Sequence, residues 1–216
     1  SAAPVNGLTG GATATVYGND TLNGAAFAPA TVTPSITANG GLAGVVINVA
    51  DGTLTVPPGT PAGSYAVTYQ ICETAVPSNC DTAIATVLVN PPAIAANDDN
   101  FTATPVNGLT GGATPTVFTN DTLNGAAFAT TAVSASITNA GGLTGATISP
   151  TGTIIVPAGT PAATYAVTYQ ICEVLNPTNC DTAIATVVVN PPAIVANDDN
   201  FTASPVNGLA GGATPT

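Results

Sequence analysis

Acidic side chains are the only charged groups in this 216-residue chain, and most of them recur along it. The chain has 11 Asp and Glu residues and no Lys, Arg or His, which gives a formal charge of −11. Carboxylate oxygens are the hard ligands that Ca²⁺ prefers, and adjacent aspartates between asparagines supply several of them. The candidate calcium ligands are therefore the recurrent aspartates Asp98, Asp99, Asp198, Asp199, Asp20 and Asp121.

The same carboxylates also fit a role without a metal. The sequence contains no DxDxDG loop, so a calcium site would need further oxygens from other aspartates or from backbone carbonyls. Aspartates in turns bind backbone N–H groups, and on a surface without lysine they keep the protein in solution. Both interpretations stay open from the sequence alone.

The composition argues against catalysis and against anionic partners. Without His and Lys the chain lacks the commonest general bases and the imidazole metal ligands. Adjacent aspartates in a strand point to opposite faces, so they do not flank a bond as a glycosidase pair does. Every acid except Asp51 has a repeated counterpart, as scaffold positions do. We expect no enzyme, no nucleic-acid partner and no membrane insertion in this segment.

Four cysteines form two equivalent pairs, Cys72 with Cys80 and Cys172 with Cys180. In each pair an alternating strand ends at the first cysteine and its partner strand begins at the second, which suits a disulfide across a hairpin. Two thiols without His do not complete a zinc site, and no base is present to activate a thiol. We expect two disulfides, and therefore an extracellular location, because disulfides persist outside the cytoplasm.

The chain repeats itself with a period of about 100 residues. The motif PVNGL occurs three times and YAVTYQICE twice. The offset is 101 residues up to Gly44 and Gly145 but 100 from Gly52 and Gly152 onward, so we expect the lost residue at a strand end. A period of this size is that of one autonomous domain. The predicted divisions are residues 1–92, residues 93–192, and the opening strand of a third repeat in residues 193–216.

The secondary structure is predicted to be all β. Residues 64–72 alternate apolar and polar side chains with a period of two, which is typical of a half-buried strand, and residues 81–89 form its antiparallel partner. Turn clusters such as NGG and PPG separate the shorter candidates. These are residues 12–17, 31–37, 45–49, 53–56 and a strand at Phe101. About seven short strands in 100 residues predict a β-sandwich for each repeat.

Two long runs carry a family resemblance. They are ANDDNFTATP…VFTNDTLNGA in residues 96–126 and TGTIIVPAGTPAATYAVTYQICEVLNPTNCDTAIATVVV in residues 151–189. Together they resemble the immunoglobulin-like and cadherin-like tandem repeats of large bacterial cell-surface proteins and adhesins. The resemblance implies tandem immunoglobulin-like sandwiches, an extracellular structural or adhesive role at the cell surface, and calcium bound by carboxylates at the junctions. It does not imply an antibody-type disulfide, because the chain lacks Trp and its paired cysteines are close in sequence.

We expect a structural segment of an extracellular bacterial filament or surface fibre, with sandwiches joined head to tail. The segment 89–92 (VNPP) leads from the last strand of one repeat directly into the next, and its two prolines limit bending. The alternative is an adhesin module that recognises a glycan or a surface through its loops. Such a module needs a divergent, aromatic-rich loop, whereas aromatics such as Tyr65 and Tyr165 are matched between the repeats. This favours the fibre.

The C-terminal segment reproduces the opening of a repeat and includes apolar Phe201, Val206 and Leu209. An unpaired strand of this kind pairs readily with an open sheet edge. We therefore expect these residues in an inter-subunit strand or in a covalent continuation of the chain. The expected partners are copies of the chain itself, or further repeats of the same polypeptide, arranged head to tail.

Overall fold

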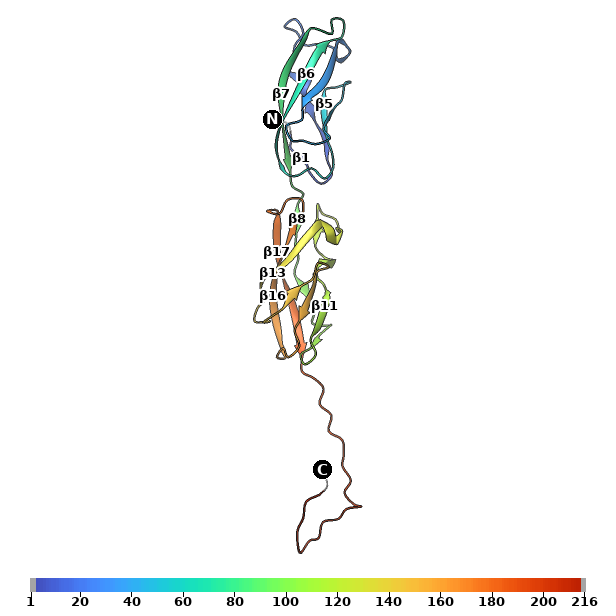
Figure 1. The fold of residues 1–216 in the computed structure, drawn as a ribbon, viewed down its shortest axis with the longest axis vertical. Coiled ribbons are helices and arrows are strands. Elements are labelled where there is room, and N and C mark those ends of the chain that lie inside the picture. Colours follow the sequence, from blue (N-terminus) through green and yellow to red (C-terminus); the bar gives the residue numbers. More distant parts are fainter. Residues whose placement is uncertain (1–2, 215–216) are drawn as a thin grey trace.

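The computed structural model of the chain describes residues 3–214, which form two β-sandwiches placed end to end and a C-terminal tail (Figure 1). The regular elements are strands and short 3-10 helices, so the prediction of an all-β chain of tandem sandwiches is confirmed. Within the described residues no helix has both the length and the apolar character needed to cross a membrane.

The first repeat runs from Val5 to Asn90. Its elements are β1 (Val5–Asn6), β2 (Gly11–Thr15), η1 (Val16–Gly18), η2 (Pro29–Thr31), β3 (Val32–Ala38), β4 (Val46–Ile47), β5 (Thr53–Val56), β6 (Gly63–Glu73) and β7 (Cys80–Asn90). One sheet has the strand order β1-β7-β6-β3, and the other has the order β2-β5-β4. The first strand pairs parallel to the last, with Val5 opposite Val89.

The second repeat runs from Ile94 to Asn190 and begins with two extra short strands. Its elements are β8 (Ile94–Ala95), β9 (Asp99–Asn100), β10 (Val106–Asn107), β11 (Gly112–Thr116), η3 (Val117–Thr119), β12 (Thr122–Leu123), η4 (Thr130–Ala132), β13 (Val133–Asn139), β14 (Thr147–Ile148), β15 (Thr153–Val156), β16 (Ala163–Glu173) and β17 (Cys180–Asn190). The sheets β10-β17-β16-β13 and β11-β15-β14 match those of the first repeat. In addition, β9 pairs with β17, and β8 pairs with β12.

Alternation along the long hairpins builds the two cores. In β16 the side chains of Tyr165, Val167, Tyr169 and Ile171 are buried, while the residues between them are exposed or half-buried. This is the period-two pattern on which the strand prediction rested, and it buries one face of the sheet. The two hydrophobic clusters share no residue, so each repeat packs around its own core.

The predicted strands differ from the observed ones mainly at their ends. The strand predicted for residues 12–17 ends at Thr15, because the Thr15 hydroxyl accepts the Tyr17 N–H and starts a 3-10 turn. The strand predicted for residues 45–49 is reduced to Val46–Ile47. The single-residue difference between the repeats lies in the loop after this strand, as expected. That loop is Asn48–Gly52 in the first repeat and Ser149–Gly152 in the second.

The tail, residues 191–214, contains turns but no helix or strand. It leaves the far end of the second repeat and extends away from both sandwiches (Figure 1). The opening strand expected in residues 193–216 therefore has no pairing partner within the described part of a single chain.

Candidate functional site: the strand groove and the repeat junction

Both expected disulfides are present. Cys72–Cys80 closes the β6–β7 hairpin and Cys172–Cys180 closes the β16–β17 hairpin, with Cα atoms 4.0 and 4.1 Å apart. The two cysteines of each pair lie directly opposite each other in the ladder. By the chain-entropy model, closing such a loop of nine residues stabilises the fold by about 2.6 kcal/mol.

In the second repeat, the segment that enters from the linker occupies the outer edge of β17. The short strand β9 lies parallel to β17, with Asp99 opposite Ala185 and Asn100 opposite Thr186. Phe101 extends this pairing, because its N–H donates to the Thr186 carbonyl at 2.9 Å. The Phe101 ring is 8% exposed and belongs to the core cluster of the repeat. The entering segment is thus a structural part of the second sandwich.

Carboxylates anchor this segment through backbone donors. The Asn97 N–H donates to Asp121 Oδ1 at 2.8 Å. In the opposite direction, the Ile184 N–H of β17 donates to Asp98 Oδ1, also at 2.8 Å. Bonds from neutral donors to charged acceptors are stronger than neutral pairs, so these contacts hold the segment in one register.

The Tyr169 hydroxyl lies at the centre of the anchor. Its oxygen is 3.0 Å from Asp99 Oδ2, 3.1 Å from Asp121 Oδ1 and 3.0 Å from the Asn97 carbonyl oxygen. Burial raises the pKa of Asp99 to about 6, and the charges of Asp121 and Asp98 add to this, although the Tyr169 hydrogen bond acts in the opposite direction. Burial also raises the pKa of Asp121. Asp99 is therefore expected to take up a proton as the pH falls through about 6.

The structure places the candidate calcium ligands differently from the sequence prediction. Asp98 and Asp99 lie within the second sandwich beside β17, rather than between the repeats, because the strands begin directly after the linker. Asp20 belongs to the first repeat, while Asp198 and Asp199 lie in the tail. Among residues 3–214 no three His, Cys, Asp or Glu side chains gather as a metal site requires. Calcium stays a prediction, and the observed partners of Asp20, Asp98, Asp99 and Asp121 are protein donors.

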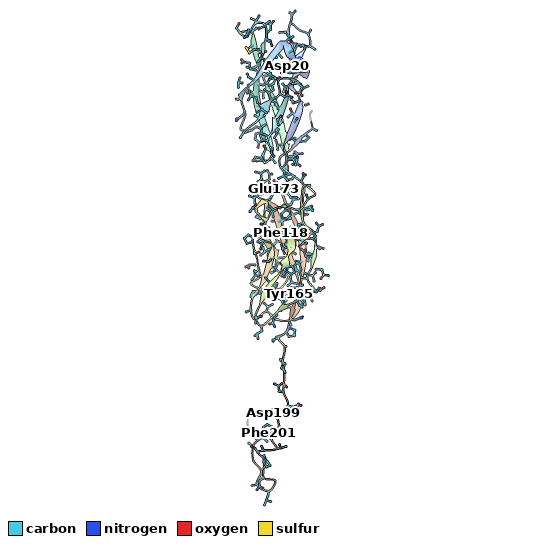
Figure 2. The ribbon with its side chains drawn as sticks, turned by 90° about the vertical axis from the view of Figure 1, so that its right-hand side faces the viewer. Asp20, Phe118, Tyr165, Glu173, Asp199 and Phe201 are labelled. Atoms are coloured by element: carbon cyan, nitrogen blue, oxygen red, sulfur yellow. A yellow bond between two sulfur atoms is a disulfide. The ribbon has the colours of Figure 1, made fainter. Side chains whose placement is uncertain are left out.

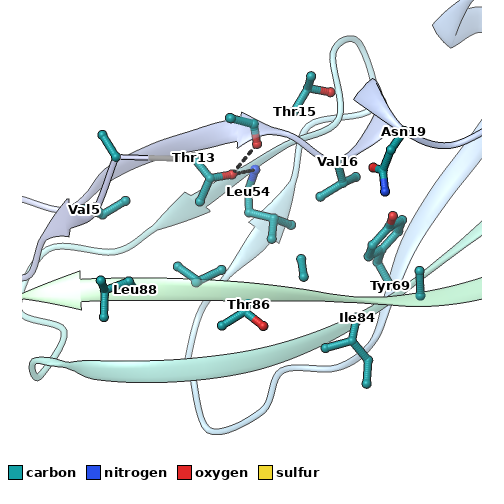
Figure 3. A pocket seen from close by; sticks show the side chains of 15 residues that line it. Val5, Thr13, Thr15, Val16, Asn19, Leu54, Tyr69, Ile84, Thr86 and Leu88 are labelled. Carbon is teal, nitrogen blue, oxygen red and sulfur yellow. Dashed lines mark hydrogen bonds between the residues drawn. The ribbon is translucent and has the colours of Figure 1, made fainter. Parts of the chain in front are cut away.

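The corresponding edge of the first repeat is open. Residues of β7 from Ala83 to Leu88 line a groove with a volume of about 460 Å³ (Figure 3). Ile84 is 66% exposed, and Ala85 is half-buried, whereas Ala185 is fully buried in the second repeat. Other side chains that face the groove are Val5, Thr13, Val16, Leu54 and Tyr69. The groove is mostly apolar and runs beside an unpaired strand edge.

The anchor groups of the groove are already in place. The Tyr69 hydroxyl donates to Asp20, with oxygen distances of 2.9 and 3.0 Å to the two carboxylate oxygens. Burial, reinforced by the hydrogen bond and charge of Asp20, raises the pKa of Tyr69. Asp20 is half-buried, while its counterpart Asp121 is 1% exposed under the entering segment. The first repeat thus contains the tyrosine and one aspartate of the cluster, Tyr69 and Asp20. In the second repeat the entering segment adds Asp99 to the equivalent pair, Tyr169 and Asp121.

Side-chain amides join the two repeats at their junction. The Ala62 N–H of the first repeat donates to Asn176 Oδ1 of the second at 2.7 Å. Asn6 Nδ2 donates to Asn124 Oδ1 at 3.1 Å. Asn124 adopts a left-handed conformation, φ 55°, in the Asn-Gly turn after β12, and such turns favour Asn followed by Gly. These bonds connect the sandwiches across a linker of only three residues, 91–93.

A buried carboxylate organises the second repeat's side of the junction. Glu173, which lies at the end of the second repeat that faces the junction (Figure 2), is 2% exposed. Its Oε2 accepts from Asn176 Nδ2 at 2.8 Å and from Asn179 Nδ2 at 3.0 Å. Asn179 Nδ2 also contacts the Pro92 carbonyl at 2.9 Å. Glu173 thereby orients the Asn176 amide, whose oxygen accepts the hydrogen bond from the Ala62 N–H of the first repeat.

The tail residues that we expected in an inter-subunit strand are exposed. Phe201 is 39% exposed, Val206 42% and Leu209 100% (Figure 2 labels Phe201). Their counterparts in the second repeat differ: Phe101 and Val106 are buried, but Leu109 is 63% exposed in a complete sandwich. A leucine at this position therefore has no core site to fill.

Sequence reasoning missed the junction amides. Asn124 and Asn176 look like ordinary turn residues, and nothing in their spacing indicates contact with the preceding repeat. The hairpin tips, residues 74–79 and 174–179, differ at four of six positions, and the exchange of Val76 for Asn176 is one of these. The exchange by itself does not single out Asn176 as a contact residue.

Comparisons with known proteins concern the fold alone. No protein-family model matches the sequence, and no curated protein matches it. Among solved structures, mouse cadherin-23 EC22-24 is 13% identical with a TM-score of 0.36, covering 75% of this chain and 53% of that chain. Drosophila N-cadherin EC1-3 is 11% identical with a TM-score of 0.32, and the match covers 88% of this chain and 64% of that chain. An endo-fucoidan hydrolase of glycoside hydrolase family 107 is 13% identical with a TM-score of 0.30, covering 76% and 24%. This chain thus spans less than two thirds of each of these chains.

Proposed function

We propose that this chain is a structural segment of an extracellular surface fibre, in which sandwich repeats are joined head to tail into a stiff rod. The observation that carries the proposal is the bonded junction. A linker of three residues, two of them proline, and amide contacts from both sides connect successive sandwiches. A short linker with polar contacts limits the angles that two domains can adopt.

Two further features support an extracellular fibre of this kind. Each repeat carries its own disulfide, and disulfides persist in oxidising compartments. The chain has no Lys or Arg, so trypsin-like proteases find no cleavage site in it. The carboxylates that could have served catalysis bind backbone N–H groups and tyrosine hydroxyls instead.

Small-angle X-ray scattering of the full chain in dilute solution tests the rod. We expect the two sandwiches to scatter as one elongated body with a narrow distribution of interdomain angles. The variant Asn176→Ala removes the acceptor for Ala62 and should broaden that distribution. Val76→Ala, at the equivalent position of the uncovered hairpin tip, is the matched control and should leave it unchanged. A broad distribution in the unmodified chain would contradict the proposal.

A further inference from the structure

The open groove of the first repeat and the C-terminal tail fit each other. Residues 191–216 repeat residues 91–116 with three differences in 26 positions, at 195, 204 and 210. In the second repeat the earlier copy of this segment fills the groove beside β17. We propose that residues 194–201 of a second copy of this chain insert into the groove of the first repeat, as a strand parallel to β7.

The second repeat supplies the register of the inserted strand. Shifted by 100 residues, the β9–β17 pairing places Asp199 opposite Ala85 and Asn200 opposite Thr86. The Phe201 N–H then donates to the Thr86 carbonyl, as its counterpart does to Thr186. The Phe201 ring moves from the exposed tail into the apolar groove. Burial of the ring removes apolar surface from water, which favours insertion, and the added backbone pairs fix its position.

Every group that anchors the strand in the second repeat has a counterpart around the groove. The Asn197 N–H meets Asp20, and the Ala196 N–H meets Asp81, because the equivalent donors bind Asp121 and Asp181. Tyr69 takes the part of Tyr169 and already donates to Asp20. The pairs that correspond are Asp20 with Asp121, Tyr69 with Tyr169, Asp81 with Asp181, and Ile84 with Ile184.

The tail of a chain does not reach the groove of its own first repeat. Strand β17 has 11 residues and rises about 36 Å along the second repeat. Only residues 191–193 separate its end from the strand, and three extended residues reach about 10 Å. The tail of a chain therefore cannot return past its own second repeat to its own first repeat.

Only part of the tail finds a free place in the groove. Residues after Phe201 repeat the sequence of the acceptor's own β1 and β2, which already pair with β7 and β5. Val206 would compete with Val5 for the position opposite Val89. Of the three tail residues predicted from the sequence, Phe201 is the one with an open site, so the strand ends there.

Insertion would recreate most of the junction between copies. Asn107 of the second copy would approach Asn23 of the first, as Asn6 approaches Asn124 within one chain. One hydrogen bond has no counterpart between copies. Within a chain the Asn176 side chain accepts from the Ala62 N–H of the preceding repeat, but the equivalent residue of the first repeat is Val76, which cannot accept. The junction between copies is therefore predicted to be weaker than the junction within a chain.

This inference rests on the proposed function for its biological meaning, but its test is separate from the test of the rod. The test is analytical ultracentrifugation of the full chain at 0.15 M salt over a range of concentrations. We expect the average mass to rise with concentration beyond that of a dimer, because head-to-tail contacts do not close. Salt should promote assembly, since each copy carries a formal charge of −11.

Tail variants identify the strand that is responsible. Phe201→Ala should weaken association at least about 100-fold, because removal of a buried phenylalanine costs more than 2.8 kcal/mol. Leu209→Ala lies outside the inserted strand and is the matched control, expected to associate like the unmodified chain. A peptide of residues 193–204 should compete for the groove and return the mass to that of a monomer.

Three results would overturn the inference. The first is a chain that stays monomeric at millimolar concentration. The second is association that Phe201→Ala leaves unchanged. The third is a closed dimer whose mass does not grow with concentration. None of these results affects the scattering test, since the angle between the two sandwiches of one chain is measured in dilute solution.

Discussion

The two repeats have nearly the same sequence, but only the second has a strand at the outer edge of its last long strand. In the second, residues 94–101 lie beside β17 and β12, and the Phe101 ring enters the core. In the first, the same edge of β7 borders a groove of about 460 Å³. The hairpin tips differ in the same way: Glu173 is buried under the preceding repeat, whereas Glu73 is half-buried and the tip around it is exposed.

The comparison shows that the sandwich of the second repeat depends on the segment directly after the linker. Residues 94–101 pair with β12 and β17, so the chain that leaves the three-residue linker becomes part of the sheet at once. A repeat without that strand keeps its own hydrophobic cluster but leaves a β-edge open.

Removing the strand's main anchor should make the second repeat resemble the first. We expect Phe101→Ala to lower the stability of the second repeat by about 3–5 kcal/mol, because a buried ring is removed and its strand is released. Hydrogen exchange, followed on peptides from β16 and β6, measures the two repeats separately. Phe201→Ala is the control, since that ring is exposed in the monomer. If β16 is as protected in Phe101→Ala as before, the strand is not part of the folding unit.

The pH dependence should also separate the repeats. The folded-state pKa of Asp99 is raised to about 6, above its unfolded value, so its contribution is complete below about pH 4 and is lost as the pH rises through 6. The second repeat should lose up to about 1.4 kcal/mol per pH unit in that window. Asp99→Asn should make the stability of the second repeat less dependent on pH. Thermal unfolding at a series of pH values, monitored by hydrogen exchange, measures this dependence. An unchanged slope in this variant would assign the effect to other carboxylates.

A polar residue at the uncovered tip should strengthen contacts between copies. Val76→Asn supplies the acceptor that Asn176 provides within a chain, and the Ala162 N–H of a second copy is the expected donor. A hydrogen bond of this kind is worth about 1 kcal/mol, or roughly fivefold in association constant. Sedimentation of the variant measures the gain, with Val76→Thr as a control of similar size. No gain over that control would mean that the junction between copies has a different geometry.

Calcium should have the smallest effect on either repeat. Asp98, Asp99 and Asp121 accept hydrogen bonds from protein donors in the second repeat, so an ion would have to displace existing partners. We expect the melting temperature to be the same in millimolar calcium and in chelator. A rise of several degrees with calcium, reversed by chelation, would support the calcium prediction, since an ion that binds only the folded state stabilises it.

The sequence predicted the sandwich more completely than it predicted the site. The β6 and β16 hairpins were predictable because their alternation is long and regular, and because cysteines mark their turns. The short strands β1, β8 and β12 have two residues each, too few for a periodic signal.

The site was only partly predictable because its residues act across long sequence separations. The Asp-Asp-Asn-Phe run was recognised as the start of a repeat, but its carboxylates suggested an ion. The structure shows Asp99 beside the Tyr169 hydroxyl, 70 residues away, and Asp98 on the Ile184 N–H, 86 residues away. Which donors meet a carboxylate depends on the strand register, and a single sequence contains no direct record of register.

Electron microscopy of the concentrated full chain shows whether sandwiches continue from one copy to the next. We expect unbranched filaments of uniform thickness with an axial repeat of two sandwiches. Every first repeat is then expected to contain a strand parallel to β7 that ends at Phe201 of the copy before it in the filament. Dispersed particles of two sandwiches, or filaments in which the groove beside β7 is empty, would contradict this expectation.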